Sequence, residues 1–345
     1  MLVRFAVAAC LSIAACSAVV RADDVIKVGI IGCDTSHVPA FTNAFHKAKP
    51  GGPLAGFRVV AAYPAGSDDI EASYSRVAGF TKTLADQGVE IVDSVEALLP
   101  KVDAVLLESV DGRPHLAQAK PLFAANRTAE KKKPLFIDKP IAASLADTLE
   151  IFRLAKESGT PVFSTSSLRY YSDIASVHGP EKRFGDVVGC VSFGPCSLDS
   201  HHPDLFWYGI HGVEILFTIM GPGCESVSCT ATKDTHVVTG VWKDGRIGTF
   251  RGIRSGKSGY GAYVFGTAAS GLTEDAQNKR SGGYEPMLVE VAQFFRGGSA
   301  PVAPEVTINL VAFMQAADES KRQGGKSIAI ADVMRQAASD ASATK

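Results

Sequence analysis

The stretch Val28-Gly29-Ile30-Ile31-Gly32-Cys33-Asp34-Thr35-Ser36-His37 decides the fold of this chain. An apolar run ends at a glycine and passes into short polar residues, a pattern that predicts a first strand turning directly into a first helix. Such a turn often holds a phosphate, because the helix N-terminus presents unpaired N–H groups and a positive dipole end. We therefore predict a cofactor site formed by Gly29, Ile31, Gly32, Asp34, Thr35, Ser36 and His37.

The turn departs from the dinucleotide fingerprint G-x-G-x-x-G. Aligned on Gly32, the chain has Asp34 and His37 where the second and third glycines belong. A side chain at the second position obstructs the close approach of a pyrophosphate, and an aspartate adds a like charge that costs about 1 kcal/mol at an exposed ~4 Å. Asp34 is therefore expected to weaken dinucleotide binding unless its carboxylate caps the first helix instead.

Strand-like and helix-like segments alternate beyond this turn, which predicts an α/β fold with a doubly wound parallel sheet, a Rossmann domain, over residues 25–145. Alternating stretches with glycine-bearing turns then predict a second, α+β domain over 146–330 with a large open antiparallel or mixed sheet. A helix at 304–323 is expected to pack back near the first domain, and 337–345 to form a flexible tail.

Composition favours a small-molecule partner. The 345 residues carry a formal net charge of -1, which provides no long-range attraction to nucleic acid or anionic lipid. Residues 1–22 have the pattern of a secretory signal peptide, so we expect a secreted or periplasmic protein; Cys16 in a lipobox-like stretch offers the alternative of a lipid-anchored protein. No later segment has the ~20 apolar residues of an integral membrane span.

Five cysteines lie beyond the signal region. In an oxidising compartment Cys190 could pair with Cys196, or Cys224 with Cys229, and isolated buried thiols are the alternative. None has the paired C-x-x-C spacing of a zinc site, and the cluster His201-His202-Pro203-Asp204 has no recognised metal spacing, so no metal is predicted.

Two residues are candidates for catalysis. Asp138-Lys139-Pro140 directly follows the strand at 135–137, and ligands of open α/β sheets bind outside the carboxyl ends of the strands, so Lys139 is expected to face the same crevice as Gly32. A lysine there can hold a substrate hydroxyl and stabilise an alkoxide. His211, early on an apolar helix, is a candidate general acid or base because histidine titrates near neutral pH.

These features together resemble the glucose-fructose oxidoreductase / inositol dehydrogenase / MocA (Gfo/Idh/MocA) family. The resemblance rests on the opening turn, on Asp138-Lys139-Pro140, on Gly209-Ile210-His211 and on the segment 315–321. It implies a Rossmann domain followed by an open-faced α/β domain, NAD or NADP as cofactor, and the hydroxyl of a sugar or polyol as substrate. Lys139 and His211 match the family's catalytic lysine and histidine. The positions that match the family near cofactor and substrate are His115, Arg169, Tyr170 and Tyr208.

Several family features are missing from the chain. The end of the second strand has Tyr63 in place of the acid that binds the ribose hydroxyls, and Trp207 stands where the family's third catalytic residue, an aspartate, belongs. We therefore keep two alternatives to a secreted NAD(P)-dependent oxidoreductase. One is a carbohydrate-binding protein without cofactor, and the other is a redox-neutral lyase or hydrolase with trapped NAD. An open sheet face in the second domain makes a homo-oligomer plausible.

Overall fold

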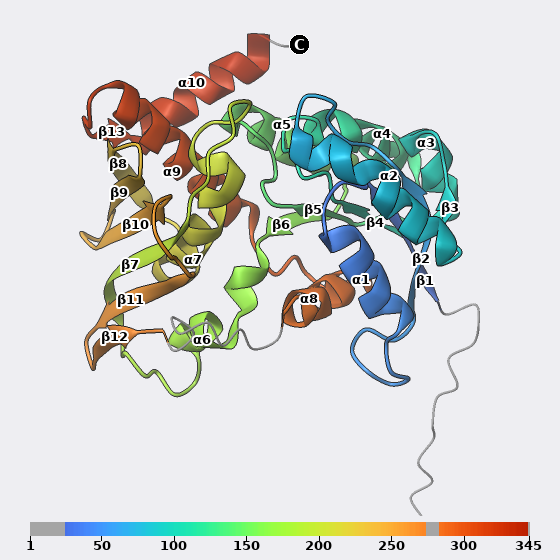
Figure 1. Ribbon diagram of the computed structural model, residues 1–345, viewed down its shortest axis with the longest axis horizontal. Coiled ribbons are helices and arrows are strands. Elements are labelled where there is room, and N and C mark those ends of the chain that lie inside the picture. The colour runs from blue at the N-terminus through green and yellow to red at the C-terminus, as the bar shows by residue number, and fades with distance from the viewer. Residues whose placement is uncertain (1–24, 274–282, 344–345) are drawn as a thin grey trace, which may run out of the picture.

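The computed structural model describes residues 25–273 and 283–343, so the predicted signal peptide at 1–22, with Cys16, lies outside the described residues. The chain forms two sheets side by side, each with helices packed on it (Figure 1). The predicted fold class, a doubly wound parallel sheet followed by a domain with a second, mixed sheet, is confirmed. Within these residues no helix is long and apolar enough to cross a membrane.

The first sheet has six parallel strands in the order β3-β2-β1-β4-β5-β6. Its strands are β1 (Ile26–Ile31), β2 (Phe57–Tyr63), β3 (Glu90–Ile91), β4 (Ala104–Leu107), β5 (Leu135–Asp138) and β6 (Val162–Thr165). Its helices are α1 (His37–His46), α2 (Glu71–Asp86), α3 (Val95–Leu98), α4 (His115–Thr128) and α5 (Leu145–Ser158). The strand order reverses between β1 and β4, so the carboxyl ends of these two strands flank the crevice where such folds bind ligands.

Both faces of this sheet are buried, as the unbroken apolar strands predict. Along β4, Val105 and Leu107 pack with residues of α3, α4 and α5, whereas Leu106 packs with residues of α1 on the opposite face. Because β6 pairs with β5, the first sheet continues past the domain boundary that we expected after residue 145. The helix and strand after 145 complete the parallel sheet before the chain leaves it.

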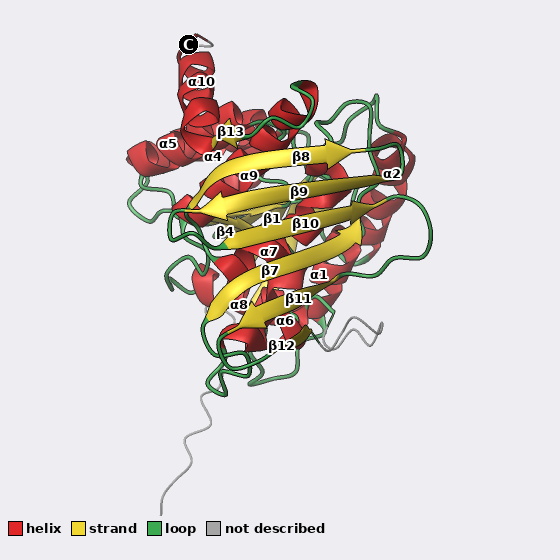
Figure 2. Ribbon diagram, turned by 90° about the vertical axis from the view of Figure 1, so that its left-hand side faces the viewer, coloured by secondary structure: helices red, strands yellow, loops and turns green. Residues whose placement is uncertain are grey.

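The second sheet has seven strands in the order β12-β11-β7-β10-β9-β8-β13 and mixes parallel and antiparallel pairs. Its strands are β7 (Val187–Pro195), β8 (Cys224–Ala231), β9 (Thr235–Trp242), β10 (Ile247–Ile253), β11 (Gly261–Gly266), β12 (Ser270–Leu272) and β13 (Ile328–Ala329). The helices of this half are α6 (Ser172–Ala175), α7 (Ile210–Met220), α8 (Glu285–Phe295), α9 (Pro304–Arg322) and α10 (Ile330–Ala343). Figure 2 shows helices behind this sheet and an open face toward the viewer.

Two late helices join the halves of the molecule. In α8, Phe294 packs edge-on against Phe163 of β6, so the chain returns to the first sheet after it has completed the strands up to β12. In α9, the side-chain carbonyl of Gln315 accepts a hydrogen bond of 3.0 Å from the backbone N–H of Leu145 at the start of α5. The helix expected at 304–323 thus packs against the first domain.

The structure differs from the sequence-based expectations at two further places. Residues 337–343 continue α10, and Ala337 is fully buried, so the expected flexible tail is helical as far as the structure describes it. The cysteines of both proposed pairs are free, buried thiols. Cys224 and Cys229 lie on one strand, where five residues at about 3.3 Å each separate them far beyond disulfide range.

Candidate functional site

A cavity of about 500 Å³ opens at the carboxyl ends of β1 and β5. Its lining residues come from the turn after β1, from α2, from the loops after β4, β5 and β6, from the start of α7, and from the chain before β11 and α8. They are Thr35, Ser36, His37, Ala72, Arg76, Val110, Lys139, Ser167, Leu168, Tyr171, Trp207, Tyr208, His211, Tyr260, Gly283 and Tyr284. Lys139 and His211, which are 72 positions apart in sequence (211 − 139), therefore reach one cavity, as predicted.

His37 begins α1 and is tied to the end of β5. Its Nδ1 lies 2.7 Å from Oδ2 of Asp138, and its ring stacks on Phe41 and meets Tyr284 edge-on. Burial alone would raise the pKa of Asp138, but the neighbouring His37 and Lys139 lower it to about 2. The carboxylate therefore stays ionised at neutral pH and fixes the orientation of the imidazole.

His211 is held from the neighbouring loop. Its Nδ1 lies 2.8 Å from Oγ of Ser166, and its ring packs against those of Tyr208 and Tyr260. A π-helical turn, η5 (Leu205–Gly209), leads directly into α7 and places Trp207 and Tyr208 on the cavity wall one turn before His211. Such turns are frequent at functional sites.

Asp34 points away from the cavity. It is fully buried, and its two carboxylate oxygens accept hydrogen bonds from Oγ of Ser73 in α2, at 2.6 Å, and from the backbone N–H of Val110, at 2.9 Å. The alternative in which Asp34 caps the first helix is not realised, because α1 begins after Ser36 without a side-chain cap. Asp34 instead ties the turn after β1 to α2 and to the loop after β4.

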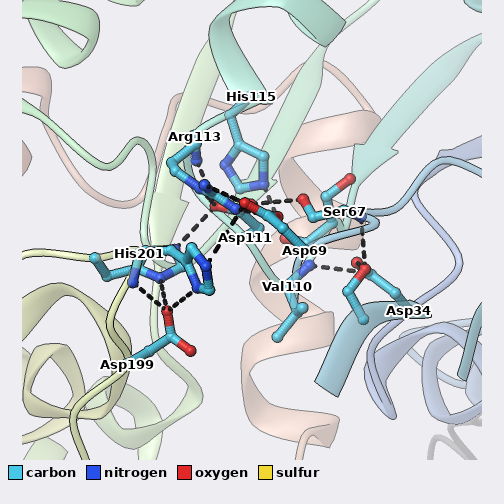
Figure 3. A network of polar contacts seen from close by, with 12 residues as sticks. Asp34, Ser67, Asp69, Val110, Asp111, Arg113, His115, Asp199 and His201 are labelled. Atoms are coloured by element: carbon cyan, nitrogen blue, oxygen red, sulfur yellow. Dashed lines mark hydrogen bonds and ion pairs between the residues drawn. The ribbon is translucent and has the colours of Figure 1, made fainter. Parts of the chain in front are cut away.

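A polar network lies beside Asp34 (Figure 3), with Asp111 and His202 buried and Asp69 at its exposed side. Asp111, in the loop after β4, accepts hydrogen bonds from Oγ of Ser67 at 2.5 Å and from Nε of Arg113, whose guanidinium also binds Asp69 at 2.7 Å. On its other side Asp111 lies 2.9 Å from Nε2 of His202, which comes from the second half of the chain. The loops after β2 and β4 are thus joined to each other across the crevice.

Other predicted cofactor residues lie outside the cavity. Gly29 and Ile31 belong to β1, and a Cβ at Gly29 would meet the side chain of Leu98 in α3. Gly32 has a φ of +90° and lies against the backbone of Ser109. His115 is fully buried, with its ring nitrogens 3.2 Å from the carbonyl oxygen of Ile141 and 2.9 Å from that of Ser109. These residues shape the sheet edge, whereas Thr35, Ser36 and His37 reach the cavity.

Of the predicted substrate residues, Tyr208 lines the cavity but Arg169 and Tyr170 do not. The Nε of Arg169 donates a 2.6 Å hydrogen bond to Glu214 of α7, so its guanidinium serves packing between η3 (Ser167–Tyr170) and α7. Burial raises the pKa of Tyr170. The next residue, Tyr171, takes the place expected of Tyr170 because the short 3-10 helix turns the backbone there.

Sequence reasoning missed several cavity residues. Arg76 lies on α2, a polar helix that buries only Ser73 and Leu84, so its apolar periodicity is weak. Tyr260 and Tyr284 come from far along the chain and reach the cavity only through the packing of the second sheet and α8. The proximity of His37 to Asp138 also had no sequence signal, although both residues stood at predicted strand ends.

Comparison with known proteins agrees with this architecture. Residues 26–166 match the model of the oxidoreductase family GFO_IDH_MocA, described as an NAD-binding Rossmann fold. The matched residues make up the first domain, and this domain belongs to the Gfo/Idh/MocA family. No curated protein sequence matches the chain. The resemblance read from the opening turn, Lys139 and His211 is thereby confirmed at the level of the family.

Solved structures of Gfo/Idh/MocA-like oxidoreductases share the fold over both halves. Myo-inositol dehydrogenase from Lactobacillus casei, in complex with NAD(H) and myo-inositol, has a TM-score of 0.66 and 17% identity, covering 88% of this chain and 96% of that one. The WlbA dehydrogenase from Chromobacterium violaceum, in complex with NADH and UDP-GlcNAcA, has a TM-score of 0.68 and 16% identity, covering 90% and 97%. Identities this low establish similarity of fold alone.

The residues of this first domain do not fit an extended dinucleotide in the usual position. The adenosine half of such a cofactor lies between the loops after the second and fourth strands, with its ribose on an acid at the end of the second strand. Here Ser67 and Asp69 are bonded to Asp111 and Arg113 across that space. The second strand ends at Tyr63 without an acid, and the buried carboxylate of Asp34 stands at the position of the second fingerprint glycine.

Proposed function

We propose that this chain is an enzyme that acts on a sugar or a related polyol in the cavity around Lys139 and His211. The observation that carries the proposal is the convergence of these two side chains on one cavity with Tyr171, Trp207 and Tyr208. Aromatic faces suit the apolar faces of sugar rings, and lysine and histidine suit proton transfer at their hydroxyls. The ligands of the two similar structures, myo-inositol and UDP-GlcNAcA, support this substrate class.

The proposal does not include NAD or NADP. Hydride transfer, the chemistry implied by the family, requires a nicotinamide bound at the crevice, and the polar network around Asp111 stands where its adenosine half would lie. The groups available in the cavity are acids, bases and hydrogen-bond donors, which suit a redox-neutral reaction. We therefore propose a redox-neutral reaction, which differs from the lyase or hydrolase alternative above in that it does not require trapped NAD.

Two further properties belong to the proposal. The signal-peptide pattern at 1–22 supports export to the periplasm or the medium. The open face of the second sheet exposes Val241, Ile247, Phe265 and other apolar side chains, which supports association between copies of the chain.

Sugar binding tests the proposal. We expect calorimetry with a panel of neutral sugars, cyclitols and sugar acids to find at least one ligand that the wild-type protein binds. Lys139→Ala and His211→Ala should weaken that binding at least ~10-fold, which corresponds to the loss of about 1.4 kcal/mol. Lys82→Ala is the matched control, since Lys82 is exposed and pairs only with Asp86 of the same helix. Equal binding by all four proteins would contradict the proposal.

A further inference from the structure

The charges around the cavity favour an anionic ligand. Among the described lining residues, Arg76 and Lys139 are cationic, His37 and His211 can become cationic, and no carboxylate is present. The nearest buried acids lie below the lining. Asp138 is bonded to His37, and Asp34 to Ser73 and Val110, so neither faces a ligand. The described lining thus carries two cations and no carboxylate, which suits a carboxylate ligand that each cation can bind through charge-assisted hydrogen bonds.

The buried Glu108 adds little negative charge to this site. It follows β4 and is fully buried, and neither of its carboxylate oxygens has a hydrogen-bond partner among the described residues. Burial, and after it the charges of Asp138 and Asp34, raise the pKa of Glu108 well above its usual value. The neutral form is favoured, so the positive character of the cavity is preserved.

His37 has the geometry of a general base. Because Nδ1 is turned to Asp138 at 2.7 Å, Nε2 on the opposite edge of the ring is the nitrogen left for a molecule in the cavity. Stacking on Phe41 and contact with Tyr284 hold the ring plane. A carboxylate behind an imidazole fixes its tautomer and stabilises the imidazolium that forms when the ring takes a proton.

We propose that the cavity binds a sugar acid and that His37, oriented by Asp138, removes the proton from the carbon next to the carboxylate. This inference rests on the proposed function, because it names the substrate class and the base of that same site. In a uronide with a substituent on the neighbouring carbon, the C–H bond breaks and its electron pair is first delocalised onto the carboxylate. This pair then forms a C=C bond to the neighbouring carbon as the C–O bond to the leaving group breaks, and the leaving oxygen takes a proton from His211.

The step is an elimination and needs no oxidant or reductant. The proton from carbon resides on Nε2 of His37 and returns to solvent, while His211 is reprotonated from solvent, so the enzyme ends as it began. Negative charge that develops on the substrate carboxylate is stabilised by Lys139 and Arg76, the two cations of the wall. His37 is a catalytic residue in this account, and Asp138 is a positioning residue.

Deuterium exchange tests the proposal directly. The probes are D-galacturonate, D-glucuronate and their 1,4-linked disaccharides, each incubated with the mature protein in D2O and followed by proton NMR. We expect loss of the signal from the proton next to the carboxylate, and with a disaccharide the ultraviolet absorbance of an unsaturated uronide. No exchange and no elimination with any of the four probes would overturn the proposal.

Three variants separate the roles. His37→Gln should reduce the exchange rate at least ~100-fold, the lower range for the loss of a general base. Asp138→Asn should reduce the rate and shift its pH profile, a readout that a merely structural role would not move. Arg76→Gln, on an exposed side chain, should weaken binding of galacturonate ~5-fold and weaken binding of the uncharged myo-inositol less than that.

The outcome also distinguishes this inference from the proposed function. Binding of myo-inositol or another neutral sugar through Lys139 and His211, without binding of any uronide, would overturn the sugar-acid proposal and leave the proposed function intact. Exchange that persists in His37→Gln would overturn the assignment of the base. Circular dichroism and thermal unfolding of each variant show whether the variant folds, and Arg76→Gln provides a test that does not depend on a buried substitution.

Discussion

Nδ1 of His37 lies 2.7 Å from Oδ2 of Asp138, and this contact joins the turn after β1 to the end of β5. The turn is the place where a dinucleotide-binding protein has its third fingerprint glycine, and the end of β5 carries the Asp-Lys-Pro motif. One hydrogen bond therefore links the position that has lost the family's pattern to the position that retains it. An imidazole held by Asp138 therefore lines the cavity at the position where a dinucleotide-binding protein has a phosphate-binding glycine.

Replacing Asp138 by asparagine should reduce turnover of a bound substrate about 100-fold or more, because the amide cannot stabilise a protonated His37. Substrate affinity should change little, since the Asp138 side chain is only 1% exposed and lies behind His37. The measurement is the rate at saturating substrate beside the dissociation constant. Asp86→Asn, at an exposed carboxylate of α2, is the control and should match the wild type.

Gly32 should tolerate no side chain. Its φ is +90°, and an added Cβ would overlap the backbone of Ser109, so Gly32→Ala combines backbone strain with a clash against main chain. We expect a loss of about 2 kcal/mol or more in the free energy of unfolding. Gly79→Ala is the matched control, because Gly79 lies within α2 with nothing within 4 Å of its Cβ position. That variant should be as stable as the wild type or up to ~1 kcal/mol more stable.

His202 should make the stability of the protein depend on pH. Burial alone would lower its pKa, but hydrogen bonds with Asp111 and Asp199 raise it above the usual 6.5. A raised histidine pKa contributes stability that is fully present below 6.5 and is lost as the pH rises through the folded-state value. The pKa of Asp111 is lowered by His202, Arg113 and Ser67 against the effect of burial, so its contribution is present above its usual 3.8 and is lost in acid.

Between about pH 4 and pH 6.5, both His202 and Asp111 contribute their full stabilisation. In that range we expect His202→Gln to cost about 3 kcal/mol, a value typical for breaking a buried ion pair. The difference in the free energy of unfolding between the wild type and the variant should be smaller at pH 9. Denaturant unfolding at pH 5.5 and pH 9 measures it, and a difference that stays equal at both values would exclude a charged His202.

Glu108 should destabilise the protein as the pH rises. Because burial raises its folded-state pKa, the unfolded chain loses this proton first, and stability falls as the pH rises above the usual 4.5. Glu108→Gln removes this titration while keeping the shape of the side chain. We expect the free energy of unfolding of the variant, relative to that of the wild type, to be larger at pH 8 than at pH 5. Denaturant unfolding at these two pH values measures it. An equal gain at both values would show that Glu108 is ionised in the folded protein.

The fold could be read from the sequence because its signals are local. The apolar run into Gly32 and the Asp138-Lys139 dipeptide after an apolar strand mark the carboxyl edge of a parallel sheet, and that edge brings distant residues together. The helix α2 was not predicted, because it buries few residues and its apolar periodicity is therefore weak. The strand β8 escaped notice because Cys224 and Cys229 suggested loops closed by disulfides.

The site could be read only in part, because its decisive contacts are tertiary. Lys139 and His211 were placed correctly from strand order and helix position. The inward turn of Asp34 depends on Ser73 and Val110, which lie 39 and 76 positions away. Tyr171 took the place expected of Tyr170 because a single 3-10 turn changes which side chain faces the cavity.

Nicotinamide binding by the purified mature protein tests the central claim most directly. The claim is that the Asp34 and Asp111 contacts bridge the crevice of the first domain and that the protein works without a dinucleotide. Mass spectrometry of ligands released from natively purified protein, with calorimetry against NAD and NADP, should show no nicotinamide and no binding. Asp34→Gly, which restores the second fingerprint glycine, should also fail to bind because Ser67 and Asp111 remain joined. Stoichiometric nicotinamide in the wild-type protein would contradict the account.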